Sequence, residues 1–274
     1  MVGRIVLVML LCSISNVLWA EGLYLQTLNN TQLTEEQRQK SLKQVTEHKQ
    51  IVLRGELEVP PFHKRGKEDA SLGNSFCTTC HLSPPHTKSI RSRTFMNMHT
   101  QYIACETCHF RPENVQLSYQ WQDTRDASIV TPKPKLFRQA VEAENKDTSL
   151  PEKKVITKDT YVINSFYKIT PFYQQQAIGL RNDNAFAEET RKLWQQEGSA
   201  LELKAERRAL IHAPLTEKGP KCEACHNEKN PLLDLAELGA TRYQLQKIQN
   251  NIVTQFFSRY KDEEQRIRIM SLLK

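Results

Sequence analysis

The sequence predicts a mainly α-helical fold with much irregular coil and a small β-containing insertion. Three observations lead to this prediction. A five-residue pattern, Cys-x-x-Cys-His, occurs three times in the 274 residues. Segments with the composition and spacing of helices stand toward both ends of the chain, and between the second and third patterns apolar residues alternate with polar ones as they do in a strand.

Residues 1–20 have the pattern of a secretory signal peptide. Arg4 supplies the basic start, an apolar run extends from Ile5 to Cys12, and a more polar stretch leads to Ala20. We expect cleavage near Ala20 and a mature protein that is periplasmic or otherwise exported. No other apolar run reaches the roughly 20 residues that a membrane-spanning helix needs, so we expect no membrane span in the mature chain.

The segment 21–55 is predicted to be helical. Thr34-Glu-Glu-Gln37 has the form of a capping box, in which the first and fourth side chains bond to each other's backbone N–H groups. The helix that it opens is expected to end near Gly55, because glycine commonly follows the last helical turn.

The segment 112–175 contains the predicted β-structure. Its residues 160–172 are rich in β-branched and aromatic side chains, which favour a strand. A second strand is predicted where apolar and polar side chains alternate. The segment has no Cys-x-x-Cys-His pattern, so we also consider it as a possible docking surface for a partner. The alternating apolar residues are Val115, Leu117, Tyr119 and Trp121.

The last section, 176–274, is predicted to be helical. Residues 185–212 favour a helix that Gly198 weakens, and Pro214 and Gly219-Pro220 break the chain before the third pattern. A final helix has an apolar stripe at three- and four-residue steps, which is expected to cover the core. Its members are Leu245, Ile248, Ile252, Phe256 and Tyr260.

The Cys-x-x-Cys-His pattern predicts covalent haem. Two thiols at this spacing can add across the two vinyl groups of a c-type haem, while the adjacent imidazole binds the iron. A structural zinc site or a thiol redox motif also uses Cys-x-x-Cys, but neither requires a histidine after each of three pairs. We therefore expect three covalently bound haem c groups. The thioether residues are Cys77, Cys80, Cys105, Cys108, Cys222 and Cys225, and the proximal iron ligands are His81, His109 and His226.

The spacing of the patterns divides the chain around the haems. The first two patterns begin 28 residues apart and define a dihaem module over 56–111. More than a hundred residues separate the second pattern from the third, which lies in the helical section 176–274.

Histidines outside the patterns are candidates for the second axial position of each iron. His99 precedes Cys105 by six residues, His212 precedes Cys222 by ten, and His63 precedes Cys77 by fourteen, so one such histidine stands shortly before every pattern. The candidate distal ligands are thus His99, His212 and His63, with His86, five residues after His81, as a fourth. His48 is expected to face solvent, and Met96 and Met98 are expected to pack against a haem.

In these three motifs, and in the closely spaced motifs and histidines from Cys77 to His109, the chain resembles exported multihaem c-type cytochromes of the mostly bis-histidine kind. The resemblance covers about a third of the chain. It implies helices and irregular coil packed around covalent haems, with haem pairs within electron-tunnelling distance, and an electron-transfer role in respiratory chemistry. The β-containing insertion between the second and third motifs departs from compact members of that group.

The function that we expect is a periplasmic trihaem cytochrome relaying single electrons between redox protein partners. A membrane-associated complex is considered as one such partner. One alternative is a multihaem oxidoreductase with an open iron that reduces a small nitrogen or sulfur oxyanion. Another is a subunit of a larger cytochrome complex. A carrier is favoured over an enzyme because four candidate histidines are available for three distal positions. The formal charge of +7 is offset by haem propionates, so nucleic acid is not an expected partner.

Overall fold

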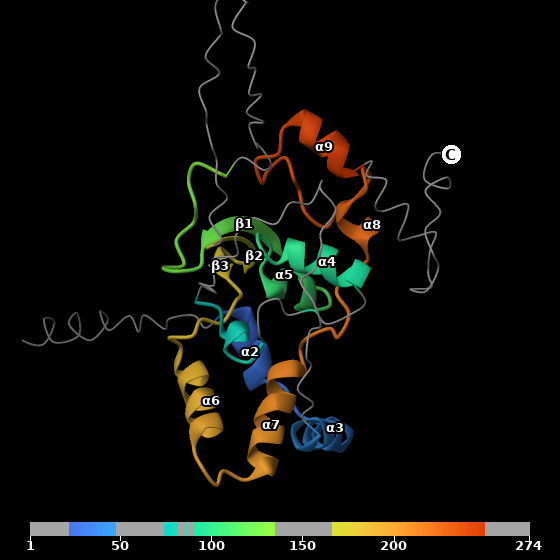
Figure 1. Ribbon diagram of the computed structural model, residues 1–274. Coiled ribbons are helices and arrows are strands. Elements are labelled where there is room, and N and C mark those ends of the chain that lie inside the picture. Colours follow the sequence, from blue (N-terminus) through green and yellow to red (C-terminus); the bar gives the residue numbers. More distant parts are fainter. Residues whose placement is uncertain (1–21, 48–73, 82–85, 87–89, 135–165, 250–274) are drawn as a thin grey trace, which may run out of the picture.

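The computed structural model describes residues 22–47, 74–81, 86, 90–134 and 166–249. A small sheet lies at the centre, and the helices are distributed around it (Figure 1). A pair of helices extends from one end of this central part, and α3 lies beside that pair. The predicted signal peptide, His48 and His63 lie outside the described residues.

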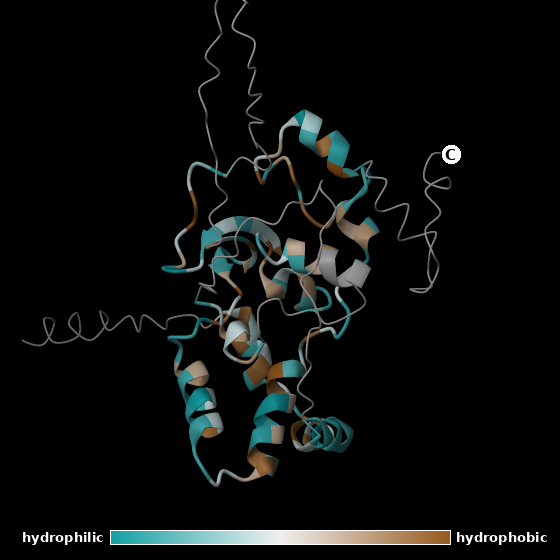
Figure 2. Ribbon diagram, in the orientation of Figure 1, coloured by the Kyte–Doolittle hydropathy of each residue, from teal (hydrophilic) through white to brown (hydrophobic). Residues whose placement is uncertain are grey.

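The N-terminal part contains two helices, α2 (Leu23–Asn29) and α3 (Glu35–Thr46). The predicted capping box is confirmed, because the backbone N of Thr34 donates to Gln37 Oε1 at 2.9 Å and the backbone N of Gln37 donates to Thr34 Oγ1 at 3.2 Å. α3 is hydrophilic over most of its surface (Figure 2). It is anchored by the buried Ser41, whose hydroxyl donates to Ala205 O at 2.6 Å. The predicted helix end near Gly55 is wrong, because α3 already ends at Thr46, with Glu47 as its C-cap. Gly55 itself lies outside the described residues.

The sheet has three antiparallel strands in the order β1-β2-β3, namely Ser118–Asp123, Tyr167–Tyr173 and Gln176–Ala177. The two predicted strand regions therefore pair with each other, with Trp121 opposite Ile169. Both of these side chains are only 1% exposed, but burial does not alternate at the end of β1, where Gln122 and Asp123 are buried as well. β3 lies just beyond the predicted boundary at 175.

The sheet forms a core rather than a free surface. The indole N–H of Trp121 donates to Leu238 O at 2.8 Å, and Trp121 and Ile169 pack with a leucine cluster from the third-motif region. Because β1 and β2 contribute to this core, the predicted docking surface is restricted to the other parts of 112–175. For those parts it stays a prediction. The leucines are Leu233, Leu235 and Leu238.

The prediction of a single helix over 185–212 is wrong. The structure has two helices there, α6 (Ala185–Gln195) and α7 (Leu201–His212), which form a hairpin. Gly198 lies between them with φ of +75°, a left-handed conformation that other residues rarely adopt. The glycine therefore interrupts the helix instead of weakening it.

The helix α9 (Arg242–Gln249) begins the predicted final helix. Its residues Leu245 and Ile248 pack against the Trp121 cluster, as expected for a stripe that covers the core. The remaining members of the stripe lie outside the described residues. No helix within the described ranges combines the length and apolar character that crossing a membrane requires.

Candidate functional site

Each Cys-x-x-Cys-His motif lies on a short helical turn. The turns are the 3-10 helix η2 (Phe76–Thr79), α5 (Cys105–His109) and α8 (Cys222–Cys225). In the first and third motifs the histidine N–H donates to the carbonyl of the first cysteine at 3.0 Å. Residues three apart in such a turn lie on one face, so the two thiols of each motif can reach a single planar group.

Each motif histidine faces one histidine from elsewhere in the chain. The ring planes meet at different angles, which are 65° in the first pair, 25° in the second and 89° in the third. The separations, by contrast, are nearly the same. Ring centroids are 6.1 Å apart for His81 and His212, 6.3 Å for His86 and His109, and 6.1 Å for His99 and His226.

These separations fit one metal ion between the two rings. An imidazole nitrogen binds a metal ion such as zinc at about 2.0–2.1 Å, and we take a similar length for iron. That nitrogen lies about 1.1 Å from the centre of a planar five-membered ring with bonds of about 1.33 Å. Two rings that bind one ion from opposite sides therefore have centres about 6.2–6.4 Å apart. The donor sets of all three motifs thus fit a haem iron with two histidine ligands.

Hydrogen bonds at Nδ1 orient five of the six rings. The acceptor in every case is a carbonyl or amide oxygen, which cannot donate, so Nδ1 must carry the hydrogen and the lone pair is left on Nε2. Metal-binding histidines are typically fixed by such a bond. The Nδ1 bonds run from His86 to Asn97 Oδ1 (2.9 Å), His99 to Phe95 O (2.7 Å), His109 to Thr216 O (2.9 Å), His212 to Arg208 O (2.8 Å) and His226 to Ile248 O (2.7 Å).

The pairing does not follow proximity in the sequence. His99 stands just before the second motif but faces the third, and His212 stands before the third but faces the first. His86 follows the first motif and faces the second. The reason at His99 is that α4 (Ile90–His99) ends there in a turn, which leads the chain onto β2 through a bond from Ala104 N to Ile169 O at 3.0 Å.

The surroundings of His212 favour a neutral ring. Burial lowers the pKa of His212, the hydrogen bond to Arg208 O partly opposes that shift, and the nearby Arg208 guanidinium lowers the pKa further. Neutral imidazole is the form that binds metals. Near neutral pH this side chain is therefore available as a ligand.

The second motif lies between the first and the third. Its buried Glu106 places Oε1 3.7 Å from Sγ of Cys77 in the first motif. Burial, with a smaller contribution from the nearby Cys108 of the second motif, raises the pKa of the Cys225 thiol to about 12. Of the six motif cysteines, only Cys80 and Cys222 are exposed, and they belong to the two outer motifs.

The described residues offer no alternative metal site of the zinc type. They contain no group of three or more His, Cys, Asp or Glu side chains that could together hold a metal ion. A structural zinc site requires about four such ligands, whereas a haem iron requires only two from the protein.

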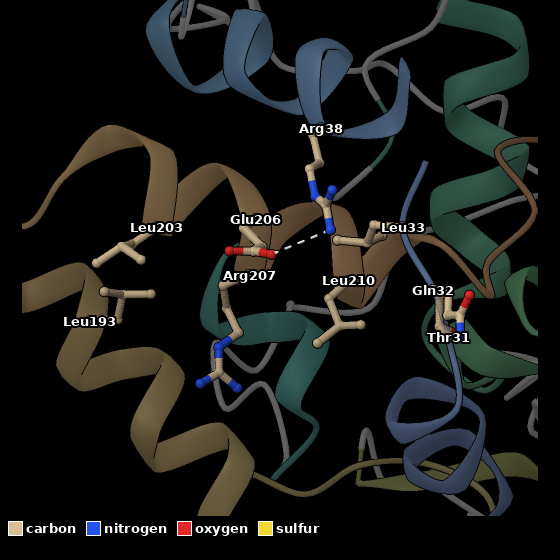
Figure 3. A pocket seen from close by; sticks show the side chains of 9 residues that line it. All are labelled: Thr31, Gln32, Leu33, Arg38, Leu193, Leu203, Glu206, Arg207 and Leu210. Atoms are coloured by element: carbon tan, nitrogen blue, oxygen red, sulfur yellow. Dashed lines mark ion pairs between the residues drawn. The ribbon is translucent and has the colours of Figure 1, made fainter. Parts of the chain in front are cut away.

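A hollow of about 760 Å³ lies apart from this chemistry, beside α3, α6 and α7 (Figure 3). An ion pair between Arg38 and Glu206, 3.7 Å long, crosses it. Its lining has no histidine and no cysteine, so it offers neither an imidazole for a haem iron nor a thiol for a thioether bond. The lining residues are Thr31, Gln32, Leu33, Arg38, Leu193, Leu203, Glu206, Arg207 and Leu210.

The sequence analysis did not predict the roles of two side chains that form hydrogen bonds at α4 and at its C-terminal end. Asn97 is 7% exposed and binds His86, and Lys168 donates to the carbonyls of Thr100 and Gln101 just after the helix, at 2.5 and 2.7 Å. A lysine in this position satisfies carbonyls that the helix leaves unbonded. A signal for Asn97 existed, since asparagine is a weak helix former and stands here between two methionines.

Comparisons with known proteins found no matching family model, no matching curated protein and no matching solved structure. The motifs and the three histidine pairs are therefore the observations on which a function can be based.

Proposed function

We propose that this protein is an exported trihaem c-type cytochrome that relays single electrons between redox partners. The observation that carries the proposal is that each motif histidine faces a second histidine at the separation that one shared iron requires. An iron with two imidazole ligands has no position left for a substrate, so it serves electron transfer rather than catalysis. When bound, haem supplies a one-electron ferric/ferrous couple.

In this proposal the cysteines attach the haems and the histidines bind the iron. The six motif cysteines form the thioether bonds, and His81, His109 and His226 bind iron from the proximal side. His212, His86 and His99 are the distal ligands in the same order. The bonds at Nδ1 make the rings better electron donors to the metal, which stabilises the ferric state and lowers the reduction potential.

The contacts between motifs support an order for the relay. The second haem is the middle one, because its motif approaches the first through Glu106 and the third through Cys108. The exposed Cys80 and Cys222 mark the outer haems as the ones whose edges partners reach. This order would let electrons enter at one outer haem and leave at the other.

The alternative of an oxidoreductase needs an iron with only one protein ligand. All three motif histidines have a facing histidine among the described residues, so no observation favours this alternative over a carrier. A subunit of a larger cytochrome complex would use the same ligands and would differ only in assembly. Size-exclusion chromatography of the purified protein distinguishes a separate carrier from a subunit of a larger complex.

The proposal is tested on mature protein produced in a host that attaches c-type haem. Its mass should exceed that of the polypeptide by three haem groups, and electron paramagnetic resonance of the oxidised protein should show low-spin iron only. The control is His212→Ala, which should convert one of the three haems to high spin. A high-spin signal equal to one haem in the unmodified protein, or a mass without haem, contradicts the proposal.

The ring angles sharpen the same measurement. The g anisotropy of low-spin ferric haem grows as its two imidazole planes turn from parallel to perpendicular. The pair His86 and His109, at 25°, should therefore give a rhombic spectrum, while His99 and His226, at 89°, should give a strongly anisotropic one. Replacing His86 should remove the rhombic signal; if another signal disappears instead, the pairing is wrong.

A further inference from the structure

Asn97 makes three hydrogen bonds to a single residue, His86. Its Oδ1 accepts from the backbone N of His86 at 3.0 Å and from the ring Nδ1 at 2.9 Å, and its Nδ2 donates to His86 O at 3.2 Å. The amide therefore binds both the backbone and the ring of the same histidine. Such a set of bonds fixes the ring position, its orientation and its tautomer together.

The burial of Asn97 shows that these bonds matter to the structure. Asn97 is only 7% exposed, and a buried amide is destabilising unless it finds hydrogen-bond partners. Asparagine also weakens a helix relative to the methionines on either side of it. Since both costs are offset only where the amide finds its partners, the contact with His86 explains why a polar residue stands at this position.

We propose that Asn97 is the positioning residue that selects and holds His86 as the distal ligand of the second haem, an inference that rests on the proposed function. His86 lies apart from any described helix, so Asn97 connects it to α4. The same helix ends in His99, the distal ligand of the third haem. One rigid element thus sets the distal ligands of two neighbouring haems.

The test compares Asn97→Ala with His86→Ala in the haem-loaded protein. Both variants should lose the rhombic low-spin signal, and after reduction both should bind carbon monoxide at one haem of three. The double variant should bind carbon monoxide at no more haems than His86→Ala alone, because the two residues act as a unit. Asn97→Leu serves as a second variant, since leucine keeps the volume and favours the helix, and it should behave like Asn97→Ala.

The matched control is Thr190→Val. Thr190 is a buried polar residue on α6, 1% exposed, whose hydroxyl donates to Phe186 O at 2.7 Å, a bond within its own helix that involves none of the three pairs. It should leave all three low-spin signals unchanged. The inference is overturned if both Asn97 variants keep three unchanged low-spin signals and bind no carbon monoxide, or if the double variant opens a second haem. Absence of covalent haem from the unmodified protein would instead overturn the proposed function.

Discussion

The central sheet and the helical hairpin hold their histidine pairs by different means. Around the sheet, Trp121 and Ile169 are each 1% exposed, and large side chains from several segments pack on them. In the hairpin, α7 buries the small Ala205 and Ala209, while its Leu203 is 54% exposed. The hairpin carries His212 at the end of α7, whereas segments packed on the sheet carry His99 and His226.

The difference in packing between the two regions indicates which histidine pairs a substitution in each region should affect. His226 is bonded to the carbonyl of Ile248, which packs on the Trp121 cluster, and the turn after His99 packs there through Tyr102 and Ile103. A change in the sheet therefore reaches both members of the third pair. A change in the hairpin reaches the first pair most directly, since His212 is the one proposed ligand that α7 carries.

The largest effect is expected for Trp121→Ala. Emptying this site should lower the free energy of unfolding by about 3–5 kcal/mol, because a cavity replaces a fully buried ring. The strongly anisotropic signal of His99 and His226 should be lost before that of His81 and His212. Denaturant titration followed by electron paramagnetic resonance measures both.

The control is Trp121→Phe, which keeps an aromatic ring but removes the bond to Leu238 O. The loss of that bond should cost about 1 kcal/mol, together with a smaller loss from the reduced ring, and should leave all three signals in place. If the His81 and His212 signal disappears first in Trp121→Ala, the two regions are not independent.

An intermediate effect is expected for Lys168→Met. The variant leaves the carbonyls of Thr100 and Gln101 without their donor, which should lower the free energy of unfolding by about 1–3 kcal/mol. The signals of the second and third pairs, which depend on α4, should broaden, while that of the first should not change.

Lys168 also predicts a pH dependence. Burial lowers the pKa of Lys168 to about 8, whereas an unfolded lysine titrates near its ordinary value of about 10.4. Between these values the unfolded chain holds more protons, so the free energy of unfolding should rise with pH from about 8 to 10. Lys168→Met should remove this rise, and denaturant midpoints at several pH values measure it; a rise of the same size in the variant would contradict the assignment.

The smallest effect is expected for Gly198→Ala. The added methyl group meets nothing within 4 Å, so the cost is only that of the positive φ, about 1 kcal/mol. The substitution should broaden the electron paramagnetic resonance signal of the His81 and His212 pair most, because α7 carries His212. Its counterpart in the sheet region is Gly239→Ala, where φ is +96° and a methyl group would lie 3.3 Å from Lys133 Cβ and Pro134 O. That variant should cost more and should affect the third pair.

The sequence predicts the local features of the fold well, because each depends on residues close together in the chain. The capping box of Thr34 and Gln37 and the strand at Trp121 are confirmed. The interruption at Gly198 was underestimated, since a glycine within a helical composition does not show whether the chain turns there or continues.

The candidate ligands were predictable as residue types but not as pairs. Three of the four distal candidates face a motif histidine, and His63 lies outside the described residues. Which histidine faces which motif depends on the path of the chain after His99 and on the hairpin that brings His212 back. Asn97 escaped prediction because its role depends on the tertiary position of His86.

Under the proposed function, the crossed pairing would have a consequence for the order in which an exported chain matures. A chain that emerges from its N-terminus presents the first motif long before His212, which stands more than a hundred residues later. A haem joined early to Cys77 and Cys80 would wait with one axial position unfilled until the last third of the chain arrived. Its closure would then tie the beginning of the chain to its end, so the first motif to receive haem would be among the last to be completed.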